Sequence, residues 1–97
     1  MSPSVPTQRV EELASLASRQ WAKGRHKRAL AALREACFLA SEDARLWALY
    51  GARLANLGRL DEAMQAIGQA IYFRKAAHDE ARVRSTRRVL ERLRVAA

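Results

Sequence analysis

The side chains best suited to chemistry in this chain are arginines near its end. Eight basic and three acidic residues stand between positions 74 and 97, and the whole chain has a formal net charge of +8. Such a surplus favours anionic partners: nucleic acid, an acidic protein segment or an anionic membrane face. On a helix, five of these arginines share one basic face: Arg84, Arg87, Arg88, Arg92 and Arg94.

This face predicts anion binding, because a row of guanidinium groups can neutralise phosphates or carboxylates. A solvated outer face of a capping helix is the alternative. No aromatic residue interleaves with the arginines to stack on bases, and no known nucleic-acid-binding motif is present. Both interpretations stay open from the sequence alone.

No set of residues in the sequence indicates catalysis or metal binding. His26 and His78 stand apart from any second histidine, cysteine or suitably spaced carboxylate. Cys37 is the one cysteine, and its apolar position predicts a buried, inert thiol. We therefore predict a protein that is not an enzyme and that binds no cofactor and no metal.

The same composition bears on location. A single cysteine allows no internal disulfide, which is typical of a reducing compartment. The first residues lack the charged start and apolar run of a signal peptide, and no stretch approaches the ~20 apolar residues that span a bilayer. We predict a soluble cytoplasmic protein without a membrane span, and the wealth of alanine and arginine suggests a bacterial source.

Helices must position these side chains, because apolar residues recur at helical spacing along most of the chain. Glycine commonly ends a helix, so Gly24 and Gly58 are predicted to end the first and the third. Short polar residues favour helix starts. The predicted elements in chain order are a flexible lead at 1–6, helices at about 8–23 and 26–40, a third helix capped by Ser41, a fourth capped by Asp61, and a fifth at about 78–95.

The junction between the fourth and fifth helices is less sharply marked. No proline or glycine separates them, so the chain either bends near His78 or continues as one long helix. We favour the bend, with Asp79 in the first turn of the last helix. Tyr72 and Phe73 precede this bend, and we expect both rings to pack beneath the fifth helix; an exposed pair would instead mark an interface.

Two halves of the chain resemble each other at a spacing of 34 residues. Residues 10–43 align with 44–77, and the matched positions include the glycines of the turns. The second copy has signature residues at Trp47, Gly51, Leu54, Gly58, Ala63, Ile67 and Ala70. In type and spacing these resemble the tetratricopeptide repeat (TPR), whose period is about 34 residues. Chance similarity between alanine-rich helices of an unrelated bundle is the alternative.

The resemblance implies an all-α fold of antiparallel helical hairpins stacked in a right-handed superhelix. It divides a single domain at 7–97 into repeat one at 10–43, repeat two at 44–77 and a basic capping helix at 78–95. Small residues at 17/51, 29/63 and 36/70 would let the paired helices approach. Both prolines of the family pattern are missing, and Leu13, Gln20 and His26 replace larger apolar residues in repeat one.

TPR proteins usually bind peptides along a concave groove lined by the first helix of each repeat. The resemblance places this partner groove at Ala14, Ser18, Trp21, Arg45, Ala48, Ala52, Asn56 and Arg82. Ala14, Ser18 and Leu49 replace residues that hold a terminal carboxylate in chaperone-binding members, so we do not predict that ligand. Trp21 is either an anchor for the partner or core packing, and Arg82 either meets an acidic ligand or covers apolar surface with its stem.

Three functions follow as hypotheses. The first is a small adaptor that binds a protein, peptide or amphipathic helix in the groove, as the resemblance implies. The second is a protein that binds nucleic acid or an acidic partner through the basic face. The third is a structural module that associates with copies of itself through its end faces.

Overall fold

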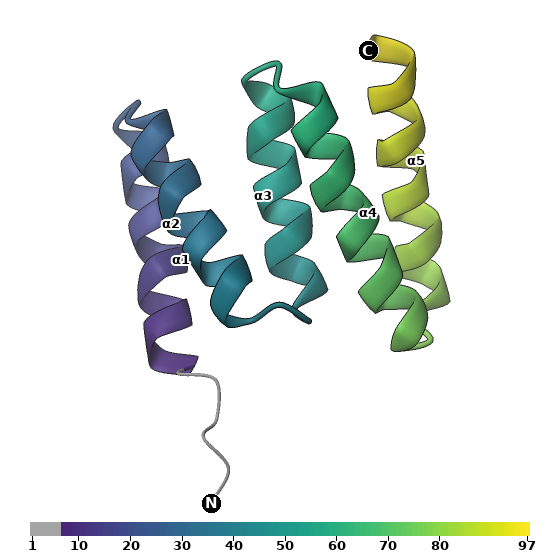
Figure 1. The fold of residues 1–97 in the computed structure, drawn as a ribbon, viewed down its shortest axis with the longest axis horizontal. Helices are drawn as coiled ribbons and strands as arrows, with labels where there is room; N and C mark the ends of the chain where they lie inside the picture. Colours follow the sequence, from purple (N-terminus) through teal and green to yellow (C-terminus); the bar gives the residue numbers. More distant parts are fainter. Residues whose placement is uncertain (1–6) are drawn as a thin grey trace, which may run out of the picture. The chain divides into compact units, whose positions relative to one another are not determined.

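The computed structural model describes residues 7–97, and every regular element in this range is an α-helix. The helices are α1 (Thr7–Ala22), α2 (His26–Leu39), α3 (Ala44–Asn56), α4 (Leu60–Ala76) and α5 (Glu80–Ala96) (Figure 1). The predicted all-α class with five helices is confirmed over this range. The predicted lead at 1–6 lies outside the described residues. None of the helices described is long and apolar enough to cross a membrane.

The helices form two compact units. The first unit contains α1 and α2 and ends at Ser41, and the second begins at Glu42 and contains α3, α4 and α5. Within each unit, helices that follow each other in the chain pack together: α1 on α2, α3 on α4, and α4 on α5. The boundary between the units lies close to the predicted junction of the two repeats.

Within the units, consecutive helices are joined by corners of one kind. Gly24, Gly58 and His78 have φ angles of 76°, 75° and 58° and follow the ends of α1, α3 and α4. Each donates its N–H to the carbonyl three residues back, and the next residue donates to the carbonyl five residues back. This is the Schellman motif, which satisfies the last carbonyls of a helix. The predicted bend near His78 is therefore confirmed.

Two of the predicted helix caps are wrong. Asp43 caps α3, since its carboxylate accepts hydrogen bonds from the backbone N–H groups of Arg45 at 3.0 Å and Leu46 at 3.3 Å. Ser41 lies two residues earlier, in the turn before α3. Asp61 lies inside the first turn of α4, and the N-cap position belongs to Arg59, which makes no side-chain cap bond. The corner at Gly58 fixes where α4 begins, so capping preference does not decide it.

Small residues allow close packing of the paired helices, as predicted. Ala29 and Ala36 of α2 are fully buried, and so is Ala63 of α4. In α3, a Cβ added at Gly51 would lie 2.8 Å from Cδ1 of Ile67, which leaves no room for a methyl group. The close approach of α3 and α4 therefore depends on the glycine.

The aromatic residues near the ends of α2 and α4 are more exposed than expected. Phe73 is half-buried and meets the ring of Tyr72 edge-on, with ring centroids 5.0 Å apart. Tyr72 itself is 63% exposed, so the prediction that both rings pack beneath α5 is wrong for this residue. Phe38, which precedes Tyr72 by 34 positions, is also exposed. Cys37 beside it is 1% exposed, which confirms the predicted buried thiol.

Candidate functional site

The second unit contains a groove between α3 and α5, two helices that are not neighbours in the chain. The groove encloses about 290 Å³, and α4 forms its floor. Its lining residues are Ala48, Ala52, Ile67, Arg74, Ser85, Thr86, Val89 and Arg92. Residues three or four apart share a face of a helix, which is why Ala48 and Ala52 form one wall and Ser85, Val89 and Arg92 form the other.

The walls of this groove are built from small or medium-sized side chains. Ala48 is half-buried and Ala52 is exposed, so the α3 wall presents only methyl groups. Ile67 in the floor is 2% exposed and belongs to the core between α3 and α4. A partner's backbone could therefore come close to α3 without displacing any large side chain.

Arg74 gives the groove its most constrained charge. This half-buried side chain in the last turn of α4 reaches α5, where its Nη1 donates a hydrogen bond to Oγ1 of Thr86. Thr86 is 3% exposed, and its hydroxyl in turn donates to the carbonyl of Arg82. Arg92 is the second cation in the lining, and no carboxylate contributes to it. The groove is thus both apolar and positively charged.

The structure brings part of the predicted partner groove together. Ala48 and Ala52 both line the concavity, together with residues of α5. Arg45 and Asn56 are exposed at the two ends of α3, outside the lining, and a guanidinium nitrogen of Arg45 lies 3.8 Å from Asp43. The cations of the groove are instead Arg74 and Arg92. From the sequence, Arg92 was placed on the basic face and Arg74 was assigned no role.

Arg82 pairs with Asp79, the N-cap residue of α5, and is not among the groove-lining residues. Its Nη1 lies 2.9 Å from Oδ2 of Asp79, and its backbone N–H donates to the same carboxylate. The hydrogen bond from the Arg82 side chain, followed by the one from its backbone, lowers the pKa of Asp79 below its usual value. The guanidinium therefore acts as part of the cap of α5.

The remaining predicted groove residues lie on α1, in the first unit. Ser18 is exposed and Ala14 is half-buried. Trp21 is half-buried at the corner between α1 and α2, where its ring is tilted against that of His26 with centroids 4.3 Å apart. This contact uses one face of the indole within the hairpin.

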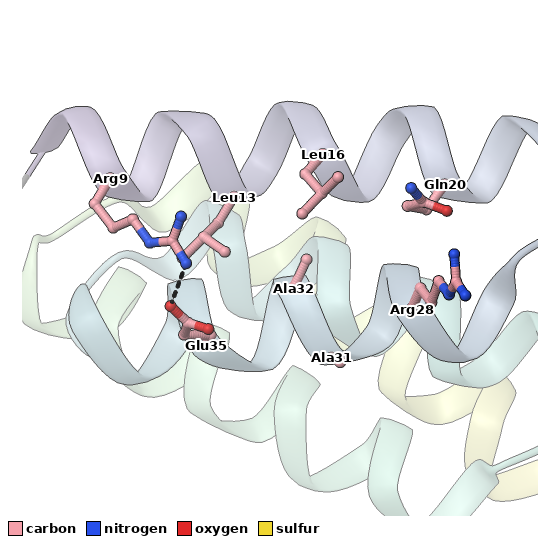
Figure 2. A pocket seen from close by; sticks show the side chains of 8 residues that line it. All are labelled: Arg9, Leu13, Leu16, Gln20, Arg28, Ala31, Ala32 and Glu35. Atoms are coloured by element: carbon pink, nitrogen blue, oxygen red, sulfur yellow. Dashed lines mark hydrogen bonds and ion pairs between the residues drawn. The ribbon is translucent and has the colours of Figure 1, made fainter.

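A second concavity lies on the first unit, in a place the sequence did not indicate. This trough of about 300 Å³ follows the seam between α1 and α2, and Figure 2 shows its lining side chains. Leu13 and Leu16 of α1 lie opposite Ala32 of α2, and at one end Arg9 pairs with Glu35 at 3.0 Å.

Polar groups occupy the opposite end of the trough. Gln20 and Arg28 lie there, and Oε1 of Gln20 is buried without a hydrogen-bond partner among residues 7–97. The sequence contained one signal for this feature, since Gln20 interrupts an otherwise apolar series and departs from the TPR pattern. The trough differs from the groove on the second unit in that a carboxylate, Glu35, belongs to its lining.

The basic face of α5 is exposed, but its five arginines are not equivalent. Arg94 pairs with Glu91 at 2.7 Å, and Arg92 borders the groove beside Val89. Arg84, Arg87 and Arg88 are exposed and have no ion pair with any residue of the described range 7–97. The predicted single face thus contains an outer triplet and one member that belongs to the groove.

No arrangement of metal ligands is seen in the described part of the chain, where no three His, Cys, Asp or Glu side chains gather. Comparisons of the sequence with protein-family models and with curated proteins, and of the chain with solved structures, find no match. The groove and the outer arginine triplet are therefore the features from which function must be argued.

Proposed function

We propose that this protein is a small non-catalytic adaptor of TPR-like architecture, which binds a peptide or helix of a partner protein in the groove between α3 and α5. In this proposal the hairpins stack as a right-handed array and α5 caps its end. The observation that carries the proposal is the groove itself: two helices separated by α4 in the chain face a common concavity with walls of small side chains.

The groove suits a peptide better than a small molecule. It is open and shallow, whereas small ligands are usually enclosed by deep pockets. An amphipathic segment can place apolar side chains against Ala48, Ala52 and Val89, and its remaining surface can stay in water. The rigid helices on both sides are already paired with α4, so binding requires little ordering of the protein.

A selection of phage-displayed peptides on the immobilised protein tests this function. We expect enriched peptides with a shared pattern, and the affinity of a synthetic copy is then measured by fluorescence anisotropy. Ala52→Trp fills the groove and should weaken binding at least about tenfold, because an indole occupies the space of the ligand's side chains. Ala76→Trp is the matched control, since Ala76 is an exposed alanine at the end of α4 outside the groove lining.

The selection contradicts the proposal if no peptide is enriched. Equal loss of affinity in Ala52→Trp and Ala76→Trp would also contradict it, because binding would then not depend on the groove. Circular dichroism of both variants shows whether they keep the helix content of the parent protein.

A second candidate function is favoured by the outer triplet on α5. Arg84, Arg87 and Arg88 are exposed, adjacent on the helix and unpaired within the described range. Such a cluster can contact the phosphates of a nucleic acid, with an affinity that falls as salt rises. Nucleic-acid binding through α5 is therefore the alternative to peptide binding in the groove.

Titration of labelled duplex DNA, single-stranded DNA and RNA at low and near-physiological salt separates the two functions. The double change Arg87→Glu and Arg88→Glu should abolish binding that depends on the triplet. The control Lys27→Glu with Arg34→Glu changes the net charge equally on exposed positions of α2. Binding that disappears equally in both variants, or that vanishes with modest salt, would identify a general charge effect and reject this alternative.

A further inference from the structure

We propose that the groove between α3 and α5 selects an acidic segment, and that Arg74 is the residue that pairs with a carboxylate of that segment. This inference rests on the proposed groove-binding function and adds the chemistry of the partner. Its ligand is an internal stretch of a partner protein that alternates small apolar residues with Asp or Glu.

The first reason is that Arg74 is a partly buried cation without a carboxylate partner. A guanidinium has five N–H donors, and in the described range the Arg74 side chain uses one of them, toward Oγ1 of Thr86. No described carboxylate lies within ion-pair distance of it. Asp79 is close enough for a Coulombic interaction with Arg74, but its carboxylate is paired with Arg82. Removing a cation from water is unfavourable unless an anion compensates it. A ligand carboxylate in the groove would supply this compensation.

The second reason is that the position of Arg74 is fixed before a ligand arrives. Thr86 is 3% exposed and is itself held by the hydrogen bond to the carbonyl of Arg82, so the guanidinium is anchored to a buried group on α5. A planar guanidinium with free donors binds a carboxylate in a two-point geometry that lysine cannot reproduce. Anchoring reduces the side-chain entropy lost when this pair forms.

The third reason is charge complementarity across the whole lining. The groove contains two arginines and no carboxylate, and its other lining residues are apolar or hydroxyl-bearing. Ala48 and Ala52 leave space for small apolar side chains of a ligand next to the cations. The trough on the first unit lacks this character, because its lining includes a carboxylate, that of Glu35, which is paired with Arg9.

The test uses two labelled amphipathic peptides of equal length. One is built of Ala, Leu and Glu, and the other has Gln at each Glu position. The full-length protein is titrated into each at near-physiological salt, and anisotropy gives the dissociation constants. We expect the Glu peptide to bind at least about tenfold more tightly than the Gln peptide, since charge-assisted hydrogen bonds are roughly twice as strong as neutral ones.

Two variants and one control assign this preference to residues. Arg74→Gln should lower the affinity for the Glu peptide about tenfold or more and leave the affinity for the Gln peptide nearly unchanged. Arg92→Gln should lower it by a smaller factor, because Arg92 is exposed. Arg84→Gln removes the same charge from α5 outside the groove lining and should change the affinity less than about twofold.

Arg92→Gln also keeps the test decisive if Arg74→Gln disturbs the junction of α4 and α5, which far-UV circular dichroism would reveal. Equal binding of the two peptides, with both sensitive to Ala52→Trp, would overturn the acidic preference and leave the groove-binding function standing. Failure of both peptides to bind, or equal losses in Arg74→Gln and Arg84→Gln, would also overturn the inference. Binding of labelled RNA that Arg74→Gln weakens about tenfold, with no binding of the Glu peptide, would assign the groove cations to nucleic acid instead.

Discussion

At the scale of single residues, two glycines inside helices have opposite roles. A Cβ at Gly51 would approach Cγ1 and Cδ1 of Ile67 to 2.8 Å and the carbonyl of Ala63 to 3.2 Å. A Cβ at Gly68 would meet nothing within 4 Å. The same substitution should therefore have different signs at the two positions, although both lie in helices.

We expect Gly51→Ala to lower the free energy of unfolding by about 1–2 kcal/mol, because overpacking outweighs the better helix propensity of alanine. Gly68→Ala should raise it by about 0.5–1 kcal/mol, since only the conformational entropy of the unfolded chain changes. Urea denaturation followed by circular dichroism measures both. Adding Ile67→Val to Gly51→Ala should recover part of the loss, because Cδ1 is removed. A Gly51→Ala protein as stable as the parent would contradict the close packing of α3 and α4.

The carboxylate of Asp79, also a single residue, makes a pH-dependent contribution to the stability of the folded protein. Its pKa is lowered in the folded protein by hydrogen bonds from the Arg82 side chain and backbone. In acid the unfolded chain therefore binds more protons at this site, so stability rises with pH there. The contribution is fully present above the ordinary pKa of an aspartate and is lost as pH falls through the lowered value.

Arg82→Ala should raise the pKa of Asp79 toward its ordinary value and should not restore it completely, because the backbone N–H of residue 82 still donates to the carboxylate. The carboxyl carbon of Asp79, followed by NMR across the acid range, reports this directly. An unchanged titration curve in the variant would show that the ion pair between Arg82 and Asp79 does not persist in solution. In that case Arg82 would be available to a ligand, as the TPR resemblance implied.

At the scale of elements, the corners of the fold show how far local sequence determines structure. Gly24 and Gly58 were predictable as helix ends because glycine adopts positive φ without strain. The third corner has His78 in the same conformation, so the sequence could indicate only a bend or a continuous helix. The start of α3 was predicted wrongly because Ser41 and Asp43 are both good N-cap residues. Which of them caps the helix depends on where the preceding turn ends.

The groove residues also divide into those that local sequence can predict and those that depend on contacts between helices. Ala48 and Ala52 were expected in a groove because of the TPR resemblance, and their spacing of four residues places them on one face of α3. Arg74 was not, because its role depends on how α4 and α5 cross and on a hydrogen bond to Thr86, twelve positions away. Arg92 was assigned to the outer face for a related reason. A helical wheel gives the directions of side chains around one helix but does not show which of them face a neighbouring helix.

His78→Gly tests the strain at the third corner. A non-glycine residue with positive φ is disfavoured by about 1 kcal/mol, so the variant should unfold at a higher urea concentration than the parent. His78→Ala should have little effect, since alanine has the same conformational restriction and lacks only the imidazole. A stabilised His78→Ala protein would show that the imidazole, and not the backbone, is the source of strain.

At the scale of the whole molecule, several acidic side chains form ion pairs with arginines close to them in the sequence. Arg59 pairs with Glu62 at 2.8 Å and Arg94 with Glu91 at 2.7 Å, each three residues apart on one exposed helix face. Exposed pairs of this kind contribute little to stability. With 18 basic and 10 acidic residues, a surplus of arginine remains after such pairing. This surplus attracts anionic partners at a distance, and the constrained Arg74 is where selectivity among them would arise.

The division into two units predicts unequal stability of the parts. The first unit is one hairpin that ends at Ser41, whereas in the second α4 packs on both α3 and α5. Chains below about 40 residues rarely fold alone without disulfides, metals or partners. We expect a fragment of residues 1–41 to be largely unfolded in isolation and a fragment of residues 42–97 to keep most of its helix and a cooperative thermal transition. Far-UV circular dichroism of both fragments, compared with the full chain, measures this difference.

The fragment experiment also bears on function, because every residue that lines the groove lies within 42–97. If this fragment folds, it should bind the Glu peptide with the affinity of the full chain, and the first unit then contributes stability or a separate contact. If it folds and binds more weakly, residues of α1 such as Trp21 take part in ligand binding, as the TPR resemblance implied. A cooperative transition in the 1–41 fragment would contradict the unequal stability, since one helix pair would then suffice to fold.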